Sequence, residues 1–427
     1  MRKILIAGSI LVCITTNVYS QFIISGEFRP RTEYRHGYKN LWIKDEYPSI
    51  HTSQRTRLSL NFIKEKLETR LTIQDVRIWG NQSQQNVSDG LLSVSEAWFK
   101  YELCKTSYLK AGRQHLVYND HRIFGNSEWN QQGRSHDALL YIVNSDKNIF
   151  HAGVAFNQDQ DRLASTQYSV SNNYKSLQFL WYNRKIESGN ISVIVLNNGI
   201  QSPASKNVSR YSQTVGAHAE NKLGKLNGIL KAYYQTGTDG ASKKDISAYL
   251  AGAELGYTLN ERTTLSAGLE ILSGQSQTDT SSSYRDVIHN FSPPYGTGHK
   301  FNGYMDYFYA GSGHGGVGLV NVFMRLKRSG EKFFVLLEPH LFLSHEDIRD
   351  PAFIQSGEYR AMDKFLGSEL DFTFGYIPQK NVTFQVGYSQ MFATKSMEAI
   401  KGGSRDETNN WAYIMIVVKP ELFRSQP

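Results

Sequence analysis

The strongest constraint on this chain is a strict alternation of apolar and charged residues that begins at Phe22. One parity holds Phe22, Ile24, Phe28, Thr32 and Tyr34, and the other holds Glu27, Arg29, Arg31, Glu33 and Arg35. Successive side chains of a β-strand point to opposite faces, so the pattern predicts a strand with one oily face and one charged face. In a soluble sandwich the charged face would meet bulk water, whereas in a membrane barrel it lines the lumen and the oily face meets lipid.

The same alternation recurs along the whole chain. It is clear in residues 55–62, 67–74, 264–271, 369–376 and 382–389. At Gln74 and Asp75 the parity slips, which indicates a β-bulge. Counting all such segments predicts about 18 strands, an even number of the size expected for a single-chain outer-membrane pore.

Short and long connections alternate between the predicted strands. Tight polar joints fall near residues 64–66, 104–106, 145–148, 185–189, 222–225, 259–262, 328–331 and 378–380. Longer connections cover residues 37–53, 80–91, 119–136, 158–174, 198–210, 237–246, 274–316, 345–366 and 393–409. A barrel inserted from the periplasm needs this order, because only its outward loops must reach past the lipid, and sandwiches show no such rule. The sequence therefore predicts an all-β transmembrane antiparallel barrel with short periplasmic turns and long extracellular loops.

The two ends of the chain fit this prediction differently. Residues 1–20 combine Arg2 and Lys3 with a short apolar run and small residues before Gln21, as a Sec signal peptide does. Residues 21–427 then form a single barrel domain. Its last predicted strand is 410–418, which must pair with the first strand because an open sheet edge in hydrocarbon is costly. Pro420 and a short tail follow that strand, and the sequence leaves open whether Phe423 replaces the usual terminal aromatic residue.

The composition agrees with a secreted membrane barrel. The chain has 47 basic and 39 acidic residues, and 25 Tyr and 22 Phe make it rich in aromatic side chains. After residue 20 no apolar run approaches the ~18 residues of a transmembrane helix. Cys104 is the only cysteine of the predicted mature chain, so neither an intrachain disulfide nor a cysteine metal cluster is expected. Outer-membrane lipid is the expected surrounding, the modest basic excess favours anionic partners weakly, and we expect no nucleic acid and no cofactor.

Strand parity assigns a dense group of charges to one lumenal wall. The first three strands contribute Arg29, Arg31, Arg35, Arg55, Arg57, Arg70 and Arg77 with Glu27, Glu33, Glu68 and Asp75. Neighbouring strands add Glu96, Lys100, Glu102 and Arg113, and Arg325 and Lys327 come from the other side. Guanidinium groups pair bidentately with carboxylates, which suits a track for an anionic polymer with interleaved acids that limit its retention. The alternative interpretation is that these residues form ion pairs that stiffen the wall.

A motif-rich segment between residues 112 and 137 points to a family. It contains Gly112-Arg113-Gln114, then Arg122-Ile123-Phe124-Gly125, then Trp129 and Arg134 before Asp137. Here the chain resembles the alginate export family of outer-membrane porins, and the stretches 74–77 and 299–306 look like the same family. The resemblance implies an eighteen-stranded barrel with an Arg-lined constriction that passes a polyuronate. Carried over by motif, the constriction candidates are Arg77, Arg113, Arg122 and Arg134.

The longest predicted loop, residues 274–316, is rich in glycine. Loops of this length are usually functional or disordered, so this one either folds over or into the pore as a gate or caps the rim. Its His289, His299 and His314 lack the spacing of metal ligands, and we expect no metal site.

Several functions compete at this stage. The preferred one is passage of an anionic polysaccharide or oligosaccharide, with periplasmic export or uptake partners. The alternative is an uptake diffusion porin for oligosaccharides or small anions, since a passive pore has no intrinsic direction. An outer-membrane hydrolase would need a nucleophile beside a base, and the sequence has no Gly-x-Ser-x-Gly elbow. We therefore predict a channel and not an enzyme.

Overall fold

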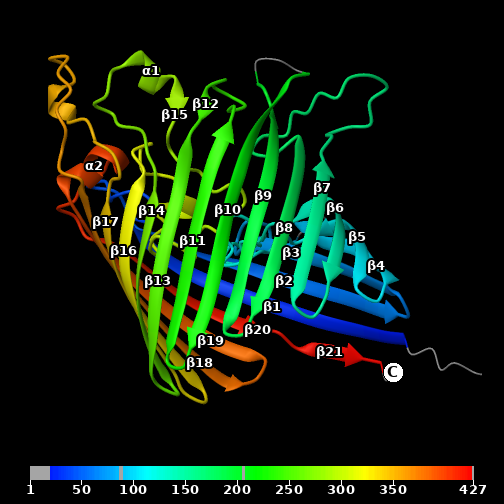
Figure 1. The fold of residues 1–427 in the computed structure, drawn as a ribbon. Helices are drawn as coiled ribbons and strands as arrows, with labels where there is room; N and C mark the ends of the chain where they lie inside the picture. The colour runs from blue at the N-terminus through cyan, green and yellow to red at the C-terminus, as the bar shows by residue number, and fades with distance from the viewer. Residues whose placement is uncertain (1–19, 86–89, 204–206, 426–427) are drawn as a thin grey trace, which may run out of the picture.

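The computed structural model describes residues 20–85, 90–203 and 207–425, and the predicted signal peptide lies outside this part except for Ser20. Eighteen antiparallel strands form a closed barrel (Figure 1). The first nine are β1 (Ser20–His36), β2 (Ser49–Lys64), β3 (Leu67–Ile78), β4 (Leu92–Cys104), β5 (Ser107–Gln114), β6 (His136–Asn144), β7 (Asn148–Phe156), β8 (Ser176–Ile186) and β9 (Gly189–Gln201). The others are β10 (Ser209–Leu223), β11 (Leu226–Gly237), β13 (Ala248–Asn260), β14 (Thr263–Leu272), β16 (Leu319–Ser329), β17 (Phe333–Leu343), β18 (Phe365–Gln379), β19 (Val382–Ala393) and β20 (Asn409–Val418). The fold class predicted from the alternation is confirmed.

The barrel closes through β1, which pairs with β2 on one side and with β20 on the other. A separate short strand, β21 (Glu421–Arg424), continues this closure after Pro420 and pairs with the first residues of β1. Figure 1 shows β21 beside the start of β1, next to the C-terminus. Phe423 stands opposite Ile24, so the aromatic residue of the tail lies on the outward parity of the sheet.

Facing residues on neighbouring strands share a side of the wall, as the alternation predicts. On β20, Ile414 is 63% exposed and stands opposite Val386, whereas Trp411 is fully buried and stands opposite Ser389. Closure leaves the apolar parity outside and the charged parity inside. Each of the eighteen strands is thus paired on both sides within the cylinder, which is the condition for strands to cross a bilayer.

The predicted bulge at Gln74 and Asp75 is wrong. The β2–β3 register runs without interruption from Ser53 opposite Ile78 to Lys64 opposite Leu67. The register shift lies instead between β3 and β4, where Ser95 has no facing partner. A bulge on β4 leaves the parity of β3 intact, so Asp75 and Arg77 remain on the outward side, which we consider again below.

The connections follow the predicted rule of eight short turns and nine long loops, although the wall is uneven in height. Strands β5, β6 and β7 have 8, 9 and 9 residues, against 17 and 16 in β1 and β2. Each strand residue adds about 3.3 Å, so the loop after β5 leaves the wall well below the rim formed by β1 and β2.

Short helices and strands lie within the long loops of the barrel. They are β12 (Asp245–Ile246) and β15 (Val287–Ile288), which pair in parallel, with α1 (Ser282–Arg285), η1 (Tyr309–Gly311), η2 (Pro351–Phe353) and α2 (Lys395–Lys401). Thr394 caps α2 by accepting a hydrogen bond from the Met397 backbone N–H. Among the described residues no helix has the length and apolar character needed to span a bilayer.

A substitution at the middle of β16 tests which side of the wall meets lipid. Met324 is 47% exposed and lies on the apolar parity, so Met324→Arg is expected to lower the free energy of unfolding by about 2–4 kcal/mol in lipid vesicles. Lys327→Arg, on the lumenal parity of the same strand, is expected to leave it unchanged. Equal stability of the two variants in urea titrations would contradict the assignment of faces.

Candidate functional site

The predicted basic wall exists on β1 and β2. Arg29 stands opposite Arg55 and Glu27 opposite Arg57, all on the lumenal parity. The side chains are nevertheless buried, with 6% exposure for Arg29 and none for Arg55. We call the four residues Arg29, Arg31, Arg55 and Arg57 the arginine clasp, because they hold a loop against the wall.

The held loop connects β5 to β6, residues 115–135, and its segment 128–132 lies on the clasp. Arg29 Nη1 donates to the Glu128 carbonyl at 2.6 Å, and Arg31 Nη1 donates to the Trp129 carbonyl at 2.7 Å. The carboxylate of Glu128 is 2.6 Å from Arg55 and 3.0 Å from Arg57. An irregular loop inside a barrel needs partners for its carbonyl groups, and here arginines supply them.

Further polar contacts fix the side chain of Gln131 in this segment. Its Oε1 accepts from Arg29 Nη2 at 2.9 Å, and its Nε2 donates to the Ser53 hydroxyl at 2.9 Å. Gly133 follows with φ +71°, and a Cβ there would lie 2.9 Å from Arg57 Nη2. The positive φ favours glycine where the chain leaves the clasp.

The other half of the same loop packs on the opposite, apolar part of the lumen. Leu116, Tyr118, Ile123 and Phe124 are buried in a cluster with Phe179 on β8 and other lumenal residues of β6–β9. Arg122, 1% exposed, forms an ion pair with Glu270 on β14. The loop thus crosses the lumen from one wall to the other.

The loop from residue 273 to 318 also folds inward and joins the first loop. Phe124 and Tyr295 form a parallel bridge, and Arg134 Nη1 donates to the Gly296 carbonyl at 2.7 Å. Further along, the backbone N–H groups of Tyr304 and Met305 donate to carboxylates of β18, those of Asp371 and Glu369 respectively. Of the two arrangements expected for this loop, the structure shows the inward one.

An aromatic stack links the two loops to both walls. The Arg31 guanidinium lies 4.0 Å from the ring centroid of Trp129, and Trp129 stacks on His299 with centroids 4.0 Å apart. His299 stacks in turn on Tyr304 at 5.1 Å, and the Tyr304 hydroxyl donates to Glu338 on β17. We call this chain of contacts the crossbeam, because it runs from β1 to β17 through the lumen.

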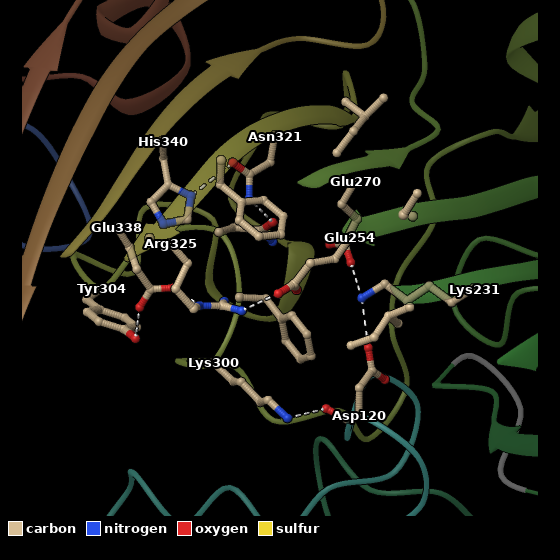
Figure 2. Close-up of a pocket in the computed structure, with 18 residues that line it drawn as sticks. Asp120, Lys231, Glu254, Glu270, Lys300, Tyr304, Asn321, Arg325, Glu338 and His340 are labelled. Atoms are coloured by element: carbon tan, nitrogen blue, oxygen red, sulfur yellow. Dashed lines mark hydrogen bonds and ion pairs between the residues drawn. The ribbon is translucent and has the colours of Figure 1, made fainter. Parts of the chain in front are cut away.

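A charged pocket of about 200 Å³ remains beside the crossbeam, lined by β11, β13, β14, β16 and β17, by residues 300–304 and by Asp120 (Figure 2). Lys231 lies 2.8 Å from Asp120 and 2.7 Å from Glu270. Arg325 bridges Glu254 at 2.8 Å and Glu338 at 2.5 Å, as Figure 2 shows. These pairs leave the pocket polar and nearly neutral.

Electrostatics inside the pocket follow from these pairs. Burial opposes ionisation of Asp120, but the ammonium group of Lys231 outweighs it and lowers the pKa of Asp120 to about 2. Lys300 differs from the other cations because it is exposed, and among the described residues its ammonium group bonds only to the Asp120 carbonyl, at 2.9 Å. Lys300 is therefore the cation of this pocket that is open to a solute.

Below the loops, towards the short-turn end, β3–β5 carry a second set of lumenal cations. Arg70 pairs with Glu96 at 2.9 Å, and Lys100 pairs with Glu68 at 2.6 Å. Lys110 lies 3.9 Å from the ring centroid of Trp98. The predicted residues Glu68 and Arg70 stand opposite Ile63 and Asn61, on the same lumenal parity of the β2–β3 pair as Arg55 and Arg57.

Three predicted pore residues do not line the lumen. Asp75 and Arg77 stand opposite Thr56 and Gln54 on the outward parity of β2, and they pair with each other. Arg113 stands opposite Asp137, with which it pairs at 3.1 Å; the two side chains are 41% and 63% exposed on the outward parity of β5 and β6. The lumenal prediction for these three is wrong, because the bulge lies on β4 and Arg113 follows the parity of Leu109.

Sequence reasoning missed most of the pocket. Lys231, Glu254, Glu270 and Glu338 are each the single charged residue on the lumenal parity of its strand. Their parity was the available signal, but parity does not tell which strands face each other across the lumen. The sequence does not show that Glu128 and Gln131 contact the arginine clasp, because these contacts depend on the path of an irregular loop.

These features define a class of protein: an eighteen-stranded outer-membrane porin with two loops folded into its lumen. A family model described as alginate export matches residues 21–311, and the chain belongs to the alginate export family. The resemblance noted in the sequence is thereby confirmed.

Solved porin structures share the fold. OccK9 (OpdG) of Pseudomonas aeruginosa is 10% identical with a TM-score of 0.60, covering 94% of this chain and 98% of that chain. OccAB1 of Acinetobacter baumannii is 11% identical with a TM-score of 0.60, covering 95% and 97%. At this identity the likeness concerns the fold alone. A search of curated proteins gives no match.

Acid titration tests how far the ion pairs of Glu128 with Arg55 and Arg57 stabilise the fold. Burial opposes ionisation of Glu128, but Arg55 and Arg57 outweigh it and lower the pKa of Glu128 to about 2. A carboxylate with a lowered pKa stabilises the fold above its usual pKa and loses this effect as the pH falls through the folded value. Glu128→Gln is thus expected to lower the free energy of unfolding by about 1–2 kcal/mol at pH 7. This difference from wild type is expected to disappear as the pH falls from about 4.5 to 2.

The control for this titration is Glu358→Gln, which removes an exposed ion pair with Arg360. Exposed pairs contribute little, so this variant is expected to follow wild type at every pH. A pH-independent difference between Glu128→Gln and wild type would contradict the ion-pair argument.

Proposed function

We propose that this porin passes an anionic polysaccharide or oligosaccharide, an alginate-like polyuronate, through its lumen. The observation that carries the proposal is the position of Lys300. It lines the charged pocket and also a second cavity of about 260 Å³ that includes Trp129, Thr297 and Tyr413. An exposed ammonium group shared by two lumenal cavities attracts carboxylates that move from one to the other.

The lumenal cations of β3–β5 support the same proposal. Arg70, Lys100 and Lys110 stand on neighbouring strands, so a carboxylate leaving Lys300 would meet further positive charge towards the short-turn end. Each has an acidic or aromatic neighbour. These neighbours weaken the hold on any one carboxylate, which favours passage over retention.

The uptake porin remains a second candidate, and one observation favours it. The crossbeam and both loops occupy the middle of the lumen, which suits short oligosaccharides or small anions better than a long polymer. Both candidates use the same charges, and they differ in the size of the solute.

A catalytic role is not part of the proposal. The Ser389 hydroxyl donates to Asp371 within the wall, and both residues are 1% exposed. This arrangement stabilises the packing of β18 against β19. It does not present a nucleophile to a solute.

Conductance in planar bilayers tests the proposal. Wild type is expected to select anions over cations and to be blocked by oligouronates but not by neutral oligosaccharides of equal length. Lys300→Ala is expected to lower the anion-to-cation permeability ratio about fivefold, the effect of one unit charge near 4 Å in water. Lys66→Ala, which removes an exposed charge in the turn after β2, is the matched control and is expected to change nothing.

Cation selectivity of the wild-type channel would overturn the proposal. Block by small anions and short oligouronates, without block by longer ones, would assign the protein to uptake of small solutes.

A further inference from the structure

We propose that the arginine clasp is a covered anion-binding site, and that loop segment 128–132 occupies it in place of an acidic glycan. The inference rests on the proposed function and adds a site and a form of regulation to it. In the described structure all four clasp arginines are 8% exposed or less, so no solute reaches them while the segment is in place.

The segment presents the clasp with a row of oxygen atoms. The carbonyl groups of Glu128, Trp129, Asn130, Gln131 and Gln132 all accept hydrogen bonds from clasp arginines. The Glu128 carboxylate adds two ion pairs. A linear acidic glycan offers the same pattern of repeated oxygen acceptors with carboxylates at intervals, so the segment resembles its chemistry.

The charge balance favours a more anionic ligand than the segment. Five guanidinium groups, those of the clasp and of Arg35, share three carboxylates, Glu27, Glu33 and Glu128. Among the described residues Arg29 has no ion pair and bonds to neutral oxygens only. A carboxylate would add the attraction of a full negative charge to the hydrogen bonds that Arg29 now makes with neutral oxygens.

One clasp donor also has no partner within the described structure. Arg55 is fully buried, and its Nε finds no acceptor. Buried donors are normally satisfied, because an unmade hydrogen bond costs about 1–3 kcal/mol. A ligand with more acceptor atoms than a backbone segment would satisfy it.

The two ends of the loop are anchored in different ways, which allows the segment to move alone. Residues 116–124 are held by apolar packing against β6–β9 and by the ion pairs of Asp120 with Lys231 and of Arg122 with Glu270. Segment 128–132 is held mainly by polar contacts, with Trp129 as its aromatic anchor in the crossbeam. Anions compete with polar contacts and leave apolar packing unchanged, so an acidic glycan would release the segment and leave the anchored end in place.

Cysteine labelling tests the release. In a Cys104→Ser background, Gln131→Cys places a reporter thiol in the segment, where the native side chain is 4% exposed. Oligouronates are expected to speed its modification by a small thiol reagent about tenfold or more, as a shift of population to the open form requires. Neutral oligosaccharides of the same length are expected to have no effect.

Two further variants keep the experiment decisive. Ser53→Cys, on β2 beneath the segment, reports the same uncovering with a nearly isosteric change if Gln131→Cys does not fold. Ile123→Cys, in the apolar anchor, is the control and is expected to stay protected with and without oligouronate.

The outcomes separate this inference from the proposed function. If oligouronates block the wild-type channel but leave labelling at positions 53 and 131 unchanged, the covered site is wrong and the proposed function stands. If labelling rises equally at 123, the loop unfolds as a whole and the clasp is not the site of displacement. If oligouronates neither block nor speed labelling, the proposed function fails as well.

Discussion

The arrangement of this barrel depends on one requirement, that charge buried inside it must be matched. The sequence places arginines on adjacent lumenal strands, and neighbouring acids alone do not neutralise them. A loop supplies the remaining partners through its backbone oxygens and one carboxylate. Guanidinium groups suit this purpose because five N–H donors in a fixed plane reach several acceptors at once. The wall and the loop are therefore parts of one polar structure.

This arrangement changes the meaning of an arginine-rich lumen. Not all charged residues that the sequence assigns to the lumenal wall are accessible to a solute, because the clasp is covered and Arg122 is paired with Glu270. The charges that stay open, Lys300 and the cations of β3–β5, are fewer and lie at different heights. A narrow lumen with few accessible cations depends on position more than on total charge for its selectivity.

The barrel was predictable from sequence because its signal is local and repeated. Alternation in stretches such as 369–376 depends only on which side of a strand meets lipid, and the turn lengths follow from the direction of insertion. The clasp arginines were placed on the correct face for the same reason. Arg77 was placed on the wrong face because the sequence interpretation put a bulge at Gln74 and Asp75, whereas the bulge lies on β4. Arg113 was placed wrongly because the family motif was preferred to the parity of its strand. Contacts made by irregular loops, such as that of Gln131 with Ser53, connect distant segments and leave no periodic trace.

The split C-terminal strand affects how the cylinder is sealed. β20 covers β1 only from Phe28 upward, and the lower part of β1 is covered by Pro420 and β21. Two separate pairings therefore close the barrel along β1, and Pro420 between them cannot donate a ladder hydrogen bond. Without β21, residues 23–25 of β1 would leave their backbone N–H and C=O groups unpaired on one side. Such an open strand edge can pair with other chains. The last residues of the chain thus protect the first strand from unwanted association.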